Sequence, residues 1–356
     1  MNNKSVKGSM ISGNPAKELI IFAIPMILGN LFQQFYNIAD SVIVGKFLGP
    51  DALAAVGASN SITTLFVMVA IGTGIGCSVI ISQLFGAGRM KDVKSSISTA
   101  LIAIFVFSLI LSTIGFMLSG NILKWMHTPS DVYEEADKYL KIYFLGFAFL
   151  FMYNAFNAVF NALGDSAKPL VFLIFSSVLN IGLDILFVWK FEWGVAGAAW
   201  ATVISQGISG ILCLVYIVKA VPILHLHKED WRPSGHLLKI QLAVGIPMAL
   251  QYSITAIGTM MVQTALNLLG STQVAAFTAA NKIEQIVTQA YVAMGTTMAT
   301  YCAQNIGAGK IKRIRQGFKS ITIMGSIYSV VVAAIIMTVG KYMTYLFLSG
   351  DLTEIM

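Results

Sequence analysis

Two aspartates, Asp40 and Asp184, fall well inside long apolar stretches of this 356-residue sequence. An ionised carboxylate at membrane depth costs several kcal/mol, so such residues are rare and usually mark a path for ions. Burial disfavours the ionised form of a carboxyl group, and a second carboxylate nearby disfavours it further. A pair of this kind can take up a proton from one side of a membrane and release it to the other.

Further polar side chains share the helix face of Asp40. Tyr36 and Asn37 precede it by four and three residues, and Gln33 lies one turn further back. Residues three and four apart are neighbours on a helix surface, so these side chains predict one wall of a wet cavity. An alternative is that Asp40 lies near a membrane interface and only caps a helix, since Gly45 follows closely.

The second aspartate has polar neighbours of the same kind. Asn180 precedes Asp184 by four residues, and Thr202 and Gln206, also four apart, place polar groups on one face of the next apolar stretch. These side chains predict a second and a third wall of the same cavity. The alternative is an interfacial position for Asp184, because Trp189 follows and tryptophan is typical of membrane interfaces.

Prolines occur at matching places in the two halves of the chain. Residues 24–26 and 246–248 both read Ile-Pro-Met. A proline inside a helix removes one hydrogen bond and bends the helix, so Pro25 and Pro247 are predicted hinges of bundles that rearrange during transport. A tolerated kink without a moving role is the alternative.

The chain also contains a longer internal repeat. Residues 83–91 return in altered form as residues 304–312, with the pattern Gly-Ala-Gly followed by a basic residue in both copies. A shared order of helix, loop and helix indicates a duplicated membrane unit, because internal repeats determine the architecture of transporters.

Composition supports a membrane protein. The sequence is 56% hydrophobic and 11% charged, with a mean hydropathy of +0.77. Apolar stretches long enough to cross about 30 Å of hydrocarbon recur along it, and they must be helices because an open sheet edge is not viable in lipid. We therefore predict an all-α polytopic membrane protein. Its nine expected spans are 17–47, 52–84, 93–119, 132–162, 167–190, 195–219, 236–268, 273–304 and 314–341.

The net charge of +7 is a topology signal and does not indicate nucleic-acid binding. With a cytoplasmic N-terminus, most lysines and arginines fall in the inside segments between these spans, as the positive-inside rule requires. We therefore expect a multi-pass protein of the bacterial plasma membrane with its N-terminus in the cytoplasm. No cleavage site for a signal peptide follows the first apolar stretch.

Breaks between the apolar stretches predict four parts. The longest polar break, residues 225–236, separates six spans from the repeat of the first three. We expect a two-lobe bundle with about nine of twelve helices present, and we interpret the chain as truncated or as a fragment. The predicted parts are a cytoplasmic tail (1–16), a six-helix lobe (17–220), a cytoplasmic linker (221–236) and an incomplete three-helix lobe (237–356).

Several of these motifs together resemble the multidrug and toxic compound extrusion (MATE) family, in its prokaryotic DNA-damage-inducible-like branch. The resemblance covers nearly the whole chain and rests on residues 23–26, 37–40, 83–88, 180–184 and 194–202. Members of that family are twelve-helix exporters with two six-helix lobes. They exchange proton or sodium entry for the efflux of cationic, amphipathic compounds.

The resemblance implies that Asp40, Asn180, Asp184 and Thr202 form a coupling site in the first lobe. Their oxygen atoms would serve a proton or a sodium ion. Other branches place an acidic residue in the seventh helix, where this chain has Thr255. The resemblance thus implies a cation-coupled antiporter for small organic compounds that acts as a monomer, needs no cofactor and is not an enzyme.

Three other functions remain as alternatives. A lipid-linked oligosaccharide flippase of the same superfamily should have a strongly basic central cavity, whereas nearly all arginines here lie in predicted cytoplasmic loops. An intramembrane aspartyl protease would need glycine directly before its second aspartate, and residues 181–184 lack it. An inactive transporter fragment is the third alternative.

Overall fold

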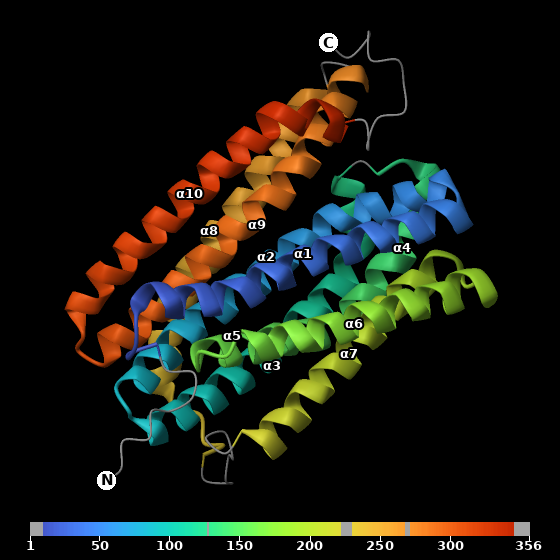
Figure 1. Ribbon diagram of the computed structural model, residues 1–356. Coiled ribbons are helices and arrows are strands. Elements are labelled where there is room, and N and C mark those ends of the chain that lie inside the picture. Colours follow the sequence, from blue (N-terminus) through green and yellow to red (C-terminus); the bar gives the residue numbers. More distant parts are fainter. Residues whose placement is uncertain (1–9, 127, 222–229, 268–270, 345–356) are drawn as a thin grey trace.

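The computed structural model describes residues 10–126, 128–221, 230–267 and 271–344 (Figure 1). The described residues form helices joined by short turns, and no strand occurs among them. The all-α fold predicted from the sequence is therefore confirmed. The helices are α1 (Pro15–Leu48), α2 (Pro50–Gly86), α3 (Met90–Trp125), α4 (Ser130–Leu145), α5 (Phe147–Ala162), α6 (Ala167–Asp184), the π-helix η1 (Ile185–Lys190), α7 (Gly194–Ala220), α8 (Gly235–Asn267), α9 (Ser271–Gly307) and α10 (Ile311–Thr344).

Each predicted span coincides with one helix or with two consecutive helices. Of the helices within the described residues, seven are long and apolar enough to cross a membrane, or eight if the bent pair α4 and α5 counts as one span. Helix α9 is not among them, because polar residues are frequent along it and Lys282 and Glu284 lie near its middle. The predicted division into lobes stays a prediction, and parts of its tail and linker (1–9 and 222–229) lie outside the described residues.

The bend between α4 and α5 is built into the core of the first bundle. The two helices meet at Gly146 with an angle of 51°. A Cβ atom at this position would overlap the side chain of Val203 on α7, so glycine leaves room for that side chain at the bend. Phe144 and Phe147, on either side of the bend, are fully buried with their ring centroids 4.9 Å apart. The packing of these aromatic side chains therefore fixes the angle between α4 and α5.

The two copies of the repeated glycine motif contact each other directly. A Cβ atom added to Gly86 of α2 would overlap the carbonyl oxygen of Gln304, and one added to Gly307 of α9 would overlap that of Gln83. The two contacts are equivalent under the internal repeat. Helices α2 and α9 thus meet backbone to backbone at one end of the molecule. We call this the inner end, which comprises residues 10–14, 86–90, 162–166, 230–234 and 307–311.

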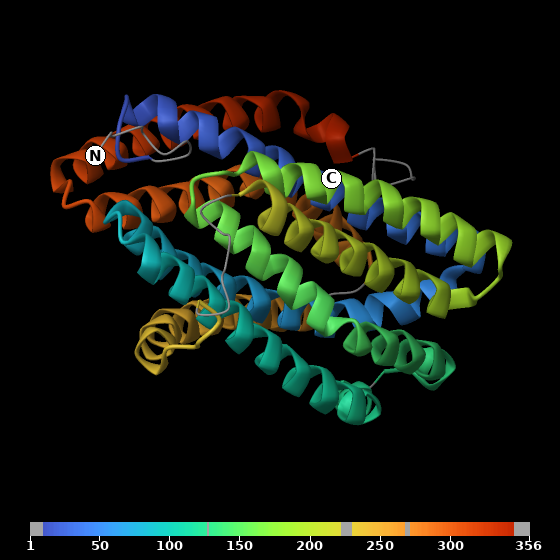
Figure 2. The ribbon, with the colours of Figure 1, turned by 90° about the horizontal axis from the view of Figure 1, so that it is seen from below.

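The contacts between the two repeat copies are concentrated toward the inner end. Helix α8 contacts α2 and α3, and α9 and α10 contact α1. At the crossing of α2 with α8, a Cβ atom on Gly72 would lie 2.5 Å from the Cα atom of Ala249. Figure 1 shows α8–α10 approaching α1 and α2 near the N-terminus and diverging from them toward the opposite end, and Figure 2 shows the same helices from below.

A groove of about 670 Å³ lies between α9 and α10. Its lining corresponds, residue by residue under the repeat, to the groove between α2 and α3. In the first copy, α5 fills that groove, so that a Cβ atom on Gly74 would lie 3.5 Å from Ala158. The second copy has no such helix among its described residues. The lining residues are Gly295, Met298, Ala299, Cys302, Ile314, Arg315 and Phe318, which correspond to Gly74, Cys77, Ser78, Ile81, Val93, Lys94 and Ile97.

The close approach of the two glycine motifs predicts that Gly86→Ala and Gly307→Ala each destabilise the fold. Because the added methyl group would overlap a main-chain carbonyl, we expect a cost of about 1–3 kcal/mol and a lower midpoint of thermal unfolding in detergent. Gly258→Ala and Gly325→Ala are the controls, since no atom lies within 4 Å of the added carbon. Equal midpoints for all four variants would contradict the prediction.

Candidate functional site

The structure places the two predicted aspartates side by side within the first bundle. Asp40 lies in the outer part of α1, and Asp184 is the last residue of α6. Asp184 is fully buried, Asp40 is half-buried with a buried Oδ1 atom, and the two carboxyl groups are close enough to interact electrostatically. A carboxylate can only accept hydrogen bonds, so direct contact between two carboxyl groups requires a proton on one of them. The geometry suits a site where a proton or another cation offsets the negative charge.

Tyr36 and Asn180, each one helical turn before one of the two aspartates, both contact Thr202 of α7. The hydroxyl of Thr202 lies 3.4 Å from the Tyr36 hydroxyl and accepts a hydrogen bond of 3.4 Å from the Asn180 amide. Asn180 and Thr202 are both buried. Of the resemblance-derived set Asp40, Asn180, Asp184 and Thr202, all four are therefore brought together, and Tyr36 joins them.

Several oxygen atoms at this site accept no hydrogen bond from a donor within the described residues. They are Asp40 Oδ1, Asn180 Oδ1, Asp184 Oδ1 and Asp184 Oδ2. Carboxylate and amide oxygens are the ligands that hard cations prefer, so the set could hold a sodium ion as well as a proton. Within the described part of the chain, this site included, no group of three or more His, Cys, Asp or Glu side chains could hold a metal ion.

The remaining predicted members differ in position. The Asn37 side chain is exposed, and its main-chain carbonyl accepts a hydrogen bond of 2.9 Å from Ser41. Gln33 is half-buried on α1, one turn further from the aspartates than Tyr36. Gln206 is half-buried on α7, and its Oε1 atom is buried without a hydrogen-bond partner among the described residues. The carboxyl pair is thus closest to the smaller set of Tyr36, Asn180 and Thr202.

Helix α4 contributes two tyrosines that the sequence analysis missed. Tyr139 and Tyr143 are close enough to Asp40 to interact with it electrostatically. Their rings are stacked, with centroids 6.1 Å apart. Their spacing of four residues was a usable signal, because it places two hydroxyl groups on one face of the predicted fourth span. The site therefore draws on four helices: α1, α4, α6 and α7.

The backbone changes its helix type directly after Asp184. Helix α6 continues as the π-helix η1, and short π segments of this kind occur frequently at functional sites. The η1 turn packs on α7 at Gly197, where a Cβ atom would lie 3.1 Å from the Phe187 carbonyl carbon. Phe187 also stacks on Trp193, with ring centroids 4.7 Å apart. This packing fixes the end of α6 that carries Asp184.

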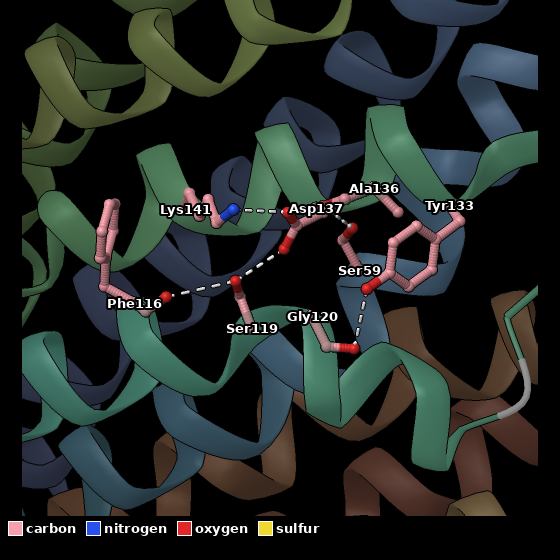
Figure 3. A network of polar contacts seen from close by, with 8 residues as sticks. All are labelled: Ser59, Phe116, Ser119, Gly120, Tyr133, Ala136, Asp137 and Lys141. Carbon is pink, nitrogen blue, oxygen red and sulfur yellow. Dashed lines mark hydrogen bonds and ion pairs between the residues drawn. The ribbon is translucent and has the colours of Figure 1, made fainter.

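A polar network holds α4 against its neighbours (Figure 3). Asp137 of α4 accepts a hydrogen bond of 2.6 Å from Ser119 of α3 and pairs with Lys141 over 2.7 Å. Ser59 of α2 donates to the main-chain carbonyl of Ala136 over 3.3 Å. These contacts lie one turn from Tyr139 and Tyr143 and set the position of both tyrosines relative to Asp40.

The predicted hinge residues lie inside continuous helices. Pro25 is part of α1 and Pro247 is part of α8. Near Pro25, the hydroxyl of Ser166 donates to the carbonyl of Phe22 over 2.8 Å and ties α1 to the start of α6. Pro247 lies between the two α8 positions that contact α2 at Gly72 and Gly76. The hinge role of the two prolines stays a prediction.

A helical membrane protein with an internal repeat and acidic side chains inside its bundle has the architecture that is typical of membrane transporters. The sequence profile of the MatE family matches residues 25–186 and 244–354. The chain belongs to this family, whose members are multi-pass membrane transporters and not enzymes.

Individual relatives agree with this assignment. The chain is 34% identical to the probable multidrug resistance protein YpnP of Bacillus subtilis over 95% of this chain and 75% of the relative. It is 30% identical to YoeA of the same organism, also named a probable multidrug resistance protein, over 84% of this chain and 66% of the relative. The chain therefore spans about two thirds to three quarters of their length.

The fold matches solved structures of the same family. An outward-facing multidrug resistance MATE family transporter of the MOP superfamily superposes with a TM-score of 0.92 at 25% identity, covering 99% of this chain and 78% of that chain. A MOP superfamily transporter from Pyrococcus furiosus gives the same score, identity and coverage.

The network around α4 predicts unequal effects of two neighbouring substitutions. Asp137→Ala leaves Ser119 and Lys141 without their partner, and we expect the free energy of unfolding to fall by about 1–3 kcal/mol. Glu135→Ala on the same helix removes only an exposed ion pair with Lys138, so we expect no measurable change. Thermal unfolding of both variants in detergent measures the difference. A Glu135 effect as large as that of Asp137 would refute this account.

Proposed function

We propose that this protein is a cation-coupled antiporter that exports small organic compounds, with Asp40 and Asp184 as the ion-binding pair. The observation that carries the proposal is the close approach of the carboxyl groups of Asp40, which is half-buried, and Asp184, which is fully buried. Because both cannot stay ionised side by side without a compensating charge, the occupancy of the site by a cation is linked to the packing of α1 against α6 and α7.

The driving force is sufficient for uphill transport. One elementary charge that moves down a potential of 100 mV releases about 2.3 kcal/mol, which sustains about a 50-fold gradient in one-for-one exchange. A proton is the first candidate for the coupling ion, since protonation of one carboxyl group removes the repulsion between the two. Sodium is the alternative, because the unpaired oxygens of Asp40, Asn180 and Asp184 are suitable ligands for it.

The proposed substrates and orientation rest on two different arguments. The relatives named as multidrug resistance proteins support organic drugs and toxic compounds as substrates. Basic residues are frequent at and directly beside the inner end, for example Arg89, Lys91, Lys310, Lys312 and Arg313, and they support a cytoplasmic position of that end. Because backbone contacts close the inner end, the described conformation corresponds to a state open toward the outside.

Asp40→Asn and Asp184→Asn are expected to abolish ion-coupled transport while membrane insertion stays normal. An amide keeps the size of the carboxyl group but cannot take up a proton. The measurement is uptake of a fluorescent organic cation into inside-out vesicles under an imposed proton or sodium gradient. Asp131→Asn is the control, since this exposed carboxylate lies at the start of α4, away from the site.

Two outcomes decide between the candidates. Full gradient-driven uptake by Asp40→Asn would refute the assignment of the ion site. Uptake that follows a sodium gradient at constant pH, and not a proton gradient, would replace the proton with sodium at the same residues. An absence of coupled uptake in the unmodified chain would refute the proposed function for this chain.

A further inference from the structure

The segment that precedes α1 is bound by the start of α10 at the inner end. Arg313 donates hydrogen bonds to three main-chain carbonyls of this segment. The accepting residues are Met10 (3.2 Å), Ser12 (3.0 Å) and Gly13 (2.9 Å). A planar guanidinium group with five donors can bind several acceptors at once in a fixed geometry. Arg313 therefore binds three of the four carbonyls of residues 10–13, and Lys310 donates to the fourth, that of Ile11, over 2.9 Å.

Two amides of α9 complete this attachment. Gln304 accepts a hydrogen bond of 2.9 Å from the Met10 main-chain nitrogen and donates one of 2.9 Å to the carbonyl of Ala162 at the end of α5. Asn305 accepts from Arg313 over 3.1 Å and donates to the Met10 carbonyl over 3.3 Å. Gln304 and Asn305 are fully buried, so these bonds are costly to leave unmade.

The segment before α8 makes the reciprocal contact. The hydroxyl of Ser98 on α3 donates to the carbonyl of Asp230 over 2.5 Å, and the main-chain nitrogen of Ser234 donates to Thr99 over 3.0 Å. Helix α3 is the repeat counterpart of α10. In each repeat copy, the segment before the first helix is thus hydrogen-bonded to the third helix of the other copy.

We propose that residues 10–14 form a latch which Arg313 holds closed, and that this latch must release before the inner end can open. The start of α1 cannot separate from α9 and α10 while its preceding carbonyls are bound to Arg313. Arg313 is therefore a positioning residue of the transport cycle. The inference rests on the proposed transport function, since a latch has a role only if the inner end opens.

The test measures the opening of the inner end directly. Spin labels are placed at Lys91→Cys and Gln316→Cys, two exposed positions at the starts of α3 and α10, after the three native cysteines are replaced. Pulsed electron paramagnetic resonance in liposomes then gives the distribution of distances between the labels. With Arg313→Ala, we expect a longer distance to appear and the ratio of open to closed molecules to rise at least tenfold.

Arg315→Ala is the matched control. It removes the same charge from the same helix, but Arg315 is exposed and makes no hydrogen bond to residues 10–14. We expect its distance distribution to equal that of the unmodified chain. An equal shift with Arg315→Ala would mean that the loss of charge, and not the loss of the latch, opens the inner end.

A shortened chain that begins at Asn14 provides a second, independent variant. It lacks the carbonyls that Arg313 binds but keeps the residue that caps α1. We expect the same shift as with Arg313→Ala, and no further shift when both changes are combined. Additive shifts would show that Arg313 only stabilises α10, and unchanged distances in both variants would overturn the latch. If Arg313→Ala fails to fold, the shortened chain alone decides.

This result is separable from the test of the proposed function. The distance measurement requires neither substrate nor an ion gradient. A shift with Arg313→Ala together with full coupled uptake by Asp40→Asn would retain the latch and reject the ion site. Loss of coupled uptake in Asp40→Asn, with no change of distance in Arg313→Ala, would retain the ion site and reject the latch.

Discussion

Two carboxyl groups buried at one place impose the central physical constraint on this molecule. In a medium of low dielectric constant, a single negative charge is costly and two adjacent ones are more so, so two carboxyl groups as close as those of Asp40 and Asp184 favour a bound proton or another compensating charge. The surrounding structure keeps them together: η1 fixes the end of α6, and the network of Asp137 fixes α4 beside α1. Under the proposed function, any movement that separates the pair or admits water changes the ion occupancy, and the reverse also holds because such coupling is reciprocal.

The inner end follows a different constraint, which is close contact of main chains. At Gly86 and Gly307 there is no side chain between α2 and α9, and the contact therefore has little room for gradual adjustment. Packed interfaces of this kind have discrete arrangements rather than a continuous range of them. The same motif in both repeat copies makes the contact symmetric, so that both halves must separate together if the inner end opens.

Local sequence patterns predicted the helices and most of the acidic site. Hydrophobic length, with Gly and Pro at the turns, located each span to within a few residues, and four-residue spacing related Asn180 to Asp184. The π-helix after Asp184 and the bend at Gly146 were not predicted, because both depend on packing against α7. The contacts of Arg313 join residues about 300 positions apart, and helical periodicity carries no information about such pairs.

The two repeat copies make similar backbone contacts at the inner end, but they differ in the polar side chains within their first helices. In α8, the hydroxyl of Thr255 donates to the carbonyl of Gln251 in its own helix, so this position offers no charge for ion binding. Under the proposed function, a change in ion occupancy at Asp40 and Asp184 reaches the inner end through a helix that belongs to both regions. Helix α1 meets this requirement, because it begins beside the contacts of Arg313 and carries Asp40 near its other end. At 34 residues it is about 50 Å long, so a tilt of the helix, or a bend at Pro25, moves one of these regions relative to the other.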